Sequence, residues 1–302
     1  MNAIKRSVFC LIAILACMTP SASGAETPGD QAKRIIDAAG FTGGLVVHVG
    51  CGDGKLTAAL RAADSILVHG LDTSDKNITV ARKHIASLGL YGKVSVQRLG
   101  SSRLPYADSV VNLVVSEDLG EVTVDEVMRV LAPKGVSYIK TGDKWIKRVK
   151  PRPKNIDEWT HYLHGPSNNA VAKDTVVGPP KRVQWICGPQ WARSHDHLST
   201  TSAMVSSAGR VFYILDEGST AFAALKPRWK LIARDAFNGV LLWKRDIGPW
   251  EGHLRGFRTG PAELARRLVA VGDRVYVTLG YGKPITALNA ATGKTETTYK
   301  DT

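Results

Sequence analysis

The sequence predicts an α/β doubly wound domain followed by an all-β domain, and three observations indicate this. Helical and strand-like segments alternate through the first half of the 302-residue chain, a pattern typical of a parallel sheet covered by helices. One of these strands runs directly into three glycines at alternate positions, Gly50, Gly52 and Gly54. The second half consists instead of short β-rich runs separated by glycine turns, and two of its segments resemble two others.

The first 25 residues are predicted to be a secretory signal peptide. Two basic residues precede an apolar stretch over 8–18, and small residues ending at Ala25 follow. The stretch is too short to span a bilayer, and Cys17 lies in a poor lipoprotein context. We therefore expect cleavage after Ala25 and export to the periplasm or the extracellular space without a lipid anchor. Only Cys51 and Cys187 would remain, so no disulfide framework is implied.

The helical segments of residues 26–143 carry apolar residues three and four apart, and the strand segments are continuous apolar runs, as in a parallel sheet. Expected helices cover 30–39, 56–63, 74–88 and 122–131. Expected strands cover 45–49, 65–71, 94–99, 110–116 and 136–140. This order predicts a Rossmann-like sheet whose ligand crevice lies at the carboxyl ends of the strands.

An acidic residue, Asp72, ends the second expected strand. A carboxylate about twenty residues after the glycines can accept hydrogen bonds from both hydroxyls of a ribose. Glycine permits positive φ and lets a ligand lie against bare main chain. The pattern therefore predicts an adenosine-type ligand. The alternative is that Asp72 only caps the helix that follows it.

Four spaced motifs resemble those of the class I S-adenosylmethionine-dependent methyltransferases. They lie at 47–54 (VHVGCGDG), 70–72 (GLD), 104–116 (LPYADSVVNLVVS) and 126–135 (EVMRVLAPKG). The resemblance implies S-adenosylmethionine as cofactor and methyl transfer to an unknown acceptor. The cofactor-binding residues that it implies are Gly50, Gly52, Gly54, Asp72, Ser101 and Ser116. No catalytic residue is indicated, because transfer to an activated acceptor can proceed by positioning alone.

Three sites depart from the family pattern. His48 stands where the family usually has an acidic residue that organises the loop and the methionine amino group. Ser101 and Ser102 stand where an acidic residue contacts the adenine, and Asn112 replaces an aspartate at the start of the fourth strand. Lost carboxylates weaken recognition of a cationic cofactor, since charge-assisted hydrogen bonds are the stronger ones. The alternative hypothesis is therefore a non-enzymatic exported binding or scaffold protein.

The basic charge is concentrated after residue 143. Residues 26–143 hold 13 Lys and Arg against 14 Asp and Glu, whereas residues 144–302 hold 25 against 13. Half of this excess lies in 144–154, where two prolines prevent a continuous helix. We expect a basic linker over 144–156 that is solvated or contacts an anionic surface. Nucleic-acid binding is not predicted, because no nucleic-acid motif accompanies the charge.

The expected all-β domain covers residues 157–302. Segment 205–215 matches 269–279, and 233–243 matches 287–297. A repeat of strand, strand and turn indicates β-propeller blades, with chance similarity of two hairpins as the alternative. The pattern that ends at Trp243 resembles the tryptophan-docking repeat of quinoprotein-like propellers, in which the Trp packs between blades.

The repeats supply only about two to three blades, whereas a closed propeller typically has four to eight. We therefore expect a partial propeller, able to bind a protein partner or belonging to a longer chain such as a quinoprotein-type oxidoreductase. Pyrroloquinoline quinone binding is not expected, because the vicinal cysteines of that family are missing. His161, His164, His195 and His197 have metal-like spacings, but no metal site is predicted since no Cys cluster accompanies them.

Overall fold

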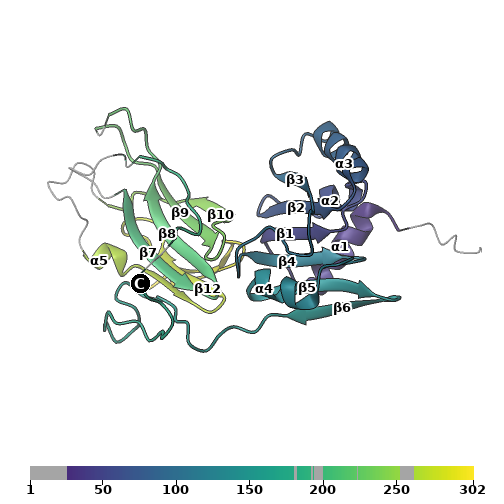
Figure 1. The fold of residues 1–302 in the computed structure, drawn as a ribbon. Helices are drawn as coiled ribbons and strands as arrows, with labels where there is room; N and C mark the ends of the chain where they lie inside the picture. The colour runs from purple at the N-terminus through teal and green to yellow at the C-terminus, as the bar shows by residue number, and fades with distance from the viewer. Residues whose placement is uncertain (1–25, 180–181, 192, 194–199, 223, 252–261) are drawn as a thin grey trace, which may run out of the picture.

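The computed structural model describes residues 26–179, 182–191, 193, 200–222, 224–251 and 262–302. An α/β part and an all-β part lie side by side (Figure 1). The predicted signal peptide, residues 1–25, lies outside the described residues. So do His195 and His197.

The α/β part is a single sheet with helices on both faces. Its elements are α1 (Pro28–Ala39), β1 (Gly44–Val49), α2 (Lys55–Ala59), β2 (Ile66–Asp72), α3 (Asp75–Ser87), β3 (Val94–Arg98), β4 (Val111–Ser116), α4 (Val124–Val130), β5 (Leu131–Thr141) and β6 (Lys144–Val149). The strand order is β3-β2-β1-β4-β5-β6, with β1 to β5 parallel. The order reverses between β1 and β4, which places a ligand crevice there. The doubly wound prediction is confirmed.

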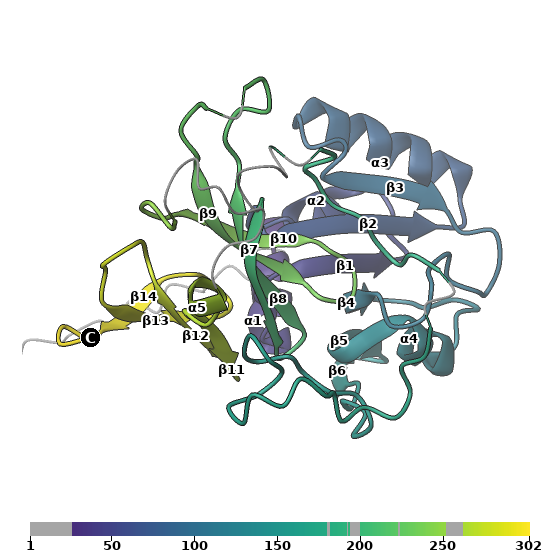
Figure 2. The same ribbon diagram turned by 90° about the vertical axis from the view of Figure 1, so that its left-hand side faces the viewer.

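The helices are divided between two cores. Helices α1, α2 and α3 pack on one face of the sheet, where Ile35, Ile78 and Ile85 are buried against Val46 and Val68. Figure 2 shows α3 lying over β3 and β2. Helix α4 packs on the other face through Val127 and Val130. Both faces of the central strands are therefore buried, which explains their continuous apolar runs.

The basic segment after residue 143 differs from the predicted linker in its first half. Residues 144–149 form β6, which pairs antiparallel with β5 at the edge of the sheet. The cause is the aromatic content of the segment, since Trp145 stacks on Tyr138 with ring centroids 5.0 Å apart. Basic side chains on an edge strand also discourage pairing with another chain. The α/β part thus extends to Val149.

The all-β part holds two four-stranded antiparallel sheets. The first is made of β7 (Thr201–Ser207), β8 (Arg210–Asp216), β9 (Trp229–Asp235) and β10 (Leu241–Asp246). A short helix, α5 (Ala262–Ala265), precedes the second sheet, made of β11 (Leu268–Val271), β12 (Arg274–Thr278), β13 (Ile285–Asn289) and β14 (Thr295–Thr298). One core joins the two sheets, with Phe212, Trp250 and Val275 fully buried in it. The all-β prediction is confirmed, and the propeller stays a prediction.

The internal repeat has a structural counterpart in two matching turns. In the turn between β9 and β10, Asp235 Oδ1 accepts hydrogen bonds from the N–H groups two and three residues later, at 2.8 and 3.0 Å. In the turn between β13 and β14, Asn289 Oδ1 accepts the equivalent bonds at 3.0 and 3.1 Å. An amide oxygen thus replaces a carboxylate oxygen without changing the turn.

A tryptophan packs on each of these turns. Trp185 lies on Gly239 and donates its Nε1–H to Ala236 O at 3.0 Å. Trp243, at the end of the first sheet, lies on Gly293 of the second sheet and donates to Ala290 O at 2.9 Å. A Cβ on either glycine would lie within 2.7 Å of the ring that covers it. The two contacts are equivalent, and the second one joins successive sheets.

The two parts of the molecule meet at the amino ends of β1 and β4. Asn112 Nδ2 donates to Asp235 Oδ2 at 2.7 Å, and Asn112 Oδ1 accepts from Asn238 Nδ2 at 2.6 Å. The same oxygen accepts from Leu45 N at 2.8 Å. The unusual asparagine at the start of the fourth strand therefore lies in the junction between the two parts.

In the part of the chain that the structure describes, no helix has the length and apolar character needed to cross a bilayer.

Candidate functional site

The glycine loop follows the end of β1 and takes a conformation that favours glycine throughout. Gly50, Gly52 and Gly54 have φ of 74°, 53° and 80°, values at which a Cβ is strained. Gly54 is also required by packing, since a Cβ there would lie 2.7 Å from the Cβ of Ala81 in α3. The loop is held to the neighbouring strand because Gly50 N and Cys51 N both donate to the carbonyl oxygen that precedes Asp72.

Asp72 joins this loop to the start of α3. One carboxylate oxygen, Oδ2, accepts from Gly52 N at 2.9 Å. The other, Oδ1, accepts from Ser74 N at 2.8 Å and from Asn77 Nδ2 at 3.1 Å. The carboxylate therefore joins the glycine loop to the residues that begin α3, whereas the helix itself is capped by the hydroxyl of Ser74. Three of the roughly four lone-pair sites of the carboxylate are used in these bonds, and the remaining acceptor site for a ligand is on Oδ2.

A cleft of about 490 Å³ lies at the carboxyl ends of β1, β2, β3 and β4. This volume is within the range of small-molecule sites. Its lining residues are Val49, Gly50, Asp72, Thr73, Leu99, Gly100, Ser101, Asp118, Leu119, Gly120, Glu121 and Val122. The cleft lies where the reversal of strand order predicts a ligand site.

Three of the six predicted binding residues line this cleft, namely Gly50, Asp72 and Ser101. Gly52 and Gly54 shape the loop behind it. Ser116 is fully buried and donates its hydroxyl to Val49 O at 2.9 Å, so it ties β4 to β1. The hydroxyl of Ser101 is exposed and bonds within its own loop, accepting from Arg103 N at 3.2 Å.

Two carboxylates that line the cleft, Asp118 and Glu121, were not predicted from the sequence. Both follow the end of β4, and the carboxyl ends of parallel strands meet at one edge of the sheet. Their position directly after the fourth strand could have indicated that they lie at the ligand site. With Asp72 they give the cleft three acidic side chains, which favours a cationic ligand.

His48 and Cys51 lie beside the glycine loop but do not line the cleft. His48 is buried, and its Nδ1 is 2.8 Å from Thr57 Oγ1 in α2. Burial lowers the pKa of His48 to about 4, so the ring is neutral at pH 7. Burial also raises the pKa of Cys51 to about 12, so the thiol is protonated and is not a nucleophile.

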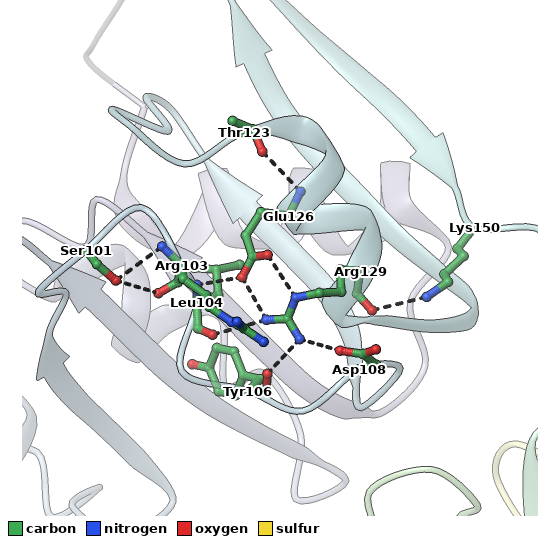
Figure 3. Close-up of polar contacts among 9 residues, drawn as sticks. All are labelled: Ser101, Arg103, Leu104, Tyr106, Asp108, Thr123, Glu126, Arg129 and Lys150. Carbon is green, nitrogen blue, oxygen red and sulfur yellow. Dashed lines mark hydrogen bonds and ion pairs between the residues drawn. The ribbon is translucent and has the colours of Figure 1, made fainter.

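One side of the cleft is supported by a polar cluster around Arg129 (Figure 3). Arg129, in α4, makes a two-bond ion pair with Glu126, at 2.8 and 2.7 Å. It also donates to the carbonyl oxygens of Leu104 at 3.3 Å and Tyr106 at 3.0 Å, and it pairs with Asp108. The α4 helix thereby holds the loop between β3 and β4.

The C-terminal histidines that the structure describes are engaged in local contacts. His164 Nε2 is 2.6 Å from Asp157 Oδ2, and His161 Nδ1 is 2.8 Å from Thr160 Oγ1. Across the described residues, no three His, Cys, Asp or Glu side chains come together in a metal-binding group.

Comparison with known proteins supports the motif resemblance. Residues 46–135 match the family model described as a methyltransferase domain. Methyltransferase GfsG of Streptomyces halstedii is 32% identical over 63% of this chain and 60% of its own length. A ubiquinone biosynthesis O-methyltransferase of Nitrosomonas europaea is 29% identical over 37% of this chain and 55% of its length. The crystal structure of a geranyl diphosphate C-methyltransferase from Streptomyces coelicolor has 20% identity and a TM-score of 0.34, over 36% of this chain and 43% of that chain.

These relatives are matched over about half of their length. Residues 46–135 form a methyltransferase domain, so the resemblance is confirmed for this part of the chain.

Proposed function

We propose that the α/β part binds S-adenosylmethionine in the cleft and transfers its methyl group to an acceptor. The observation that carries this proposal is Asp72, which lines the cleft while its carboxylate is bound to the glycine loop. A carboxylate fixed in this way at the end of β2 is placed to accept ribose hydroxyls. The methyltransferase family of residues 46–135 supports the same cofactor.

The residues of the cleft fit this cofactor. The bare main chain at Gly50 lets a ligand approach closely. Asp118 and Glu121, which follow β4, add negative charge to the lining. When bound, S-adenosylmethionine supplies a methyl group on a positively charged sulfonium sulfur. The acidic lining therefore supplies negative charge to a cleft in which Ser101 provides none.

The role of the protein in such a transfer is to bind and orient. Asp72 would hold the ribose, and the bare main chain at Gly50 would let the cofactor lie close to the loop. No side chain of the cleft has to remove a proton when the acceptor is already activated. Tyr106 is not a candidate base, because burial raises the pKa of its hydroxyl.

The proposal is tested by calorimetric titration of the full chain with S-adenosylmethionine and with S-adenosylhomocysteine. Asp72→Asn should weaken binding about 10- to 100-fold, since hydrogen bonds to a charged group contribute about 1.5–3 kcal/mol. Asp75→Asn is the matched control, because Asp75 is an exposed carboxylate three residues away that pairs with Arg98. The absence of binding to the wild-type chain at millimolar ligand, or equal affinities of wild type and Asp72→Asn, would contradict the proposal.

We further propose that the all-β part is a partial propeller of the quinoprotein-like type. The support is the tryptophan contact that recurs at Trp185 and Trp243, each with its Nε1–H on the carbonyl oxygen of an equivalent turn. Two successive four-stranded antiparallel sheets sharing one core agree with two blades.

A further inference from the structure

The proposed cofactor cleft has two walls that come from different loops. One wall, Leu99 to Ser101, follows β3. The other, residues 118–122, follows β4 and leads directly into α4, whose first turn is capped by Thr123. The shape of the cleft therefore depends on what fixes the first loop relative to α4.

Glu126 and Arg129, one turn apart on α4, make this connection. Glu126 Oε1 accepts the main-chain N–H of Leu104 at 2.7 Å. The guanidinium of Arg129 makes five hydrogen bonds, two of them to the carbonyl oxygens of Leu104 and Tyr106. A guanidinium group has five N–H donors, so every donor of Arg129 makes a hydrogen bond.

Glu126 and Arg129 each stabilise the charged form of the other. The hydrogen bonds from Arg129 lower the pKa of the Glu126 carboxyl, and Glu126 in turn raises the pKa of Arg129. A lysine could not replace Arg129, because a compact ammonium has three donors and no planar fork. A second anchor holds the same loop, where the Tyr106 hydroxyl lies 2.6 Å from His69 Nδ1 on β2.

We propose that Glu126 and Arg129 are positioning residues that set the separation of the two cleft walls and thereby the affinity for the cofactor. The pair does not touch the ligand. It fixes the loop that begins at Leu99, so that Gly100 and Ser101 stay opposite residues 118–122. This inference rests on the proposed function, since it concerns affinity in the same cleft.

The test uses the full chain and the Arg129→Lys variant, with S-adenosylhomocysteine as the probe. Arg129→Lys keeps a positive charge but loses bonds to the loop, so we expect Kd to rise about tenfold. In the ligand-free variant, hydrogen exchange should become faster at residues 100–108 and stay unchanged in β1 and β2.

Two control variants separate positioning from general loss of stability. Asp108→Asn weakens the ion pair at an exposed partner of Arg129 and leaves the bonds to Leu104 and Tyr106, so Kd should not change. Ile85→Val lowers stability from the core on the opposite face of the sheet and should also leave Kd unchanged.

The outcomes distinguish a failure of the positioning role from a failure of the proposed function. If wild type binds and Arg129→Lys binds equally well, the positioning role is wrong while the proposed function stands. If Ile85→Val weakens binding as much as Arg129→Lys, general destabilisation explains the effect and the positioning role is again wrong. If wild type itself does not bind, the proposed function fails, and this inference fails with it.

Discussion

His48 stands at a position where the methyltransferase family usually carries an acid. Its imidazole is buried on the side of the sheet that faces α2, with Nδ1 on the hydroxyl of Thr57. A carboxylate in this place would have to be desolvated close to Asp72. The neutral ring supports the glycine loop without adding a buried charge, so the substitution changes how the loop is held and does not remove its support.

This burial predicts a loss of stability in acid. The pKa of His48 is about 4 in the folded protein and about 6.5 in an unfolded chain. Between these values the unfolded state binds more protons, so stability is present above pH 6.5 and is lost as the pH falls toward 4. The expected loss from this group between pH 7 and pH 5 is about 2 kcal/mol.

The measurement is urea unfolding at both pH values, followed by hydrogen exchange in β1. The control is His48→Asn, whose amide can replace the Nδ1 contact and does not titrate. The pH dependence should shrink by about the same 2 kcal/mol in this variant. An undiminished pH dependence would assign the effect to other groups, such as the half-buried His69.

At the scale of elements, two glycine turns of the all-β part are each covered by a tryptophan from elsewhere in the chain, at Gly239 and at Gly293. Gly293 has φ of 69° and lies beneath the ring of Trp243. Gly272, in the turn between β11 and β12, has φ of 57°, and a Cβ there would have no atom within 4 Å. The two glycines share a backbone requirement and differ in packing.

Gly293→Ala and Gly272→Ala therefore isolate the energy of tryptophan docking. In both variants the free energy of unfolding should fall by about 1–2 kcal/mol, because alanine is strained in the left-handed conformation. Gly293→Ala should lose a further 1–3 kcal/mol because its methyl group collides with the indole ring. Urea unfolding of both variants checks this difference. Equal losses of stability would mean that the contact of Trp243 with the second sheet does not contribute to stability.

The helices and strands of the α/β part follow from local sequence, because their apolar periodicity and caps act over short distances. Thr27, Ser74 and Thr123 each accept a hydrogen bond at the start of a helix. β6 could not be recognised in the same way. Its basic residues indicate a linker, whereas antiparallel pairing with β5 and the stacking of Trp145 on Tyr138 make the segment part of the sheet.

For the whole molecule, the main feature is that the two parts meet at the end of the sheet opposite the cleft. β1 begins beside the junction at Gly44 and ends at the cleft with Val49. Six residues in extended conformation separate the two sites by about 17 Å. The all-β part therefore leaves the carboxyl ends of the strands uncovered.

The junction is expected to be specific for an amide at position 112 and a carboxylate at position 235. Burial raises the pKa of Asp235, although its hydrogen bonds oppose this shift. Asn112→Asp would place a second carboxylate against it, and Asp235→Asn would place two amide donors face to face. Each single change should cost about 1–3 kcal/mol.

The double variant Asn112→Asp with Asp235→Asn restores one amide and one carboxylate with their roles exchanged. The turn tolerates an amide, as Asn289 shows. Chemical denaturation of the four proteins should give a coupling energy of about 1 kcal/mol or more in favour of the double variant. Additive losses would mean that the junction contributes nothing specific to stability.

The sequence by itself determined the doubly wound sheet, the glycine loop with Asp72, the methyltransferase family of residues 46–135 and the duplicated hairpins. These features are encoded by short-range periodicity and by residues close in the chain. The tertiary structure alone decided that Ser116 is buried between strands, that Asp118 and Glu121 line the cleft, and that Asn112 joins the two parts. Each of these depends on segments far apart in sequence that meet only when the sheet has formed, and the sequence indicates at most that Asp118 and Glu121 follow the end of a strand.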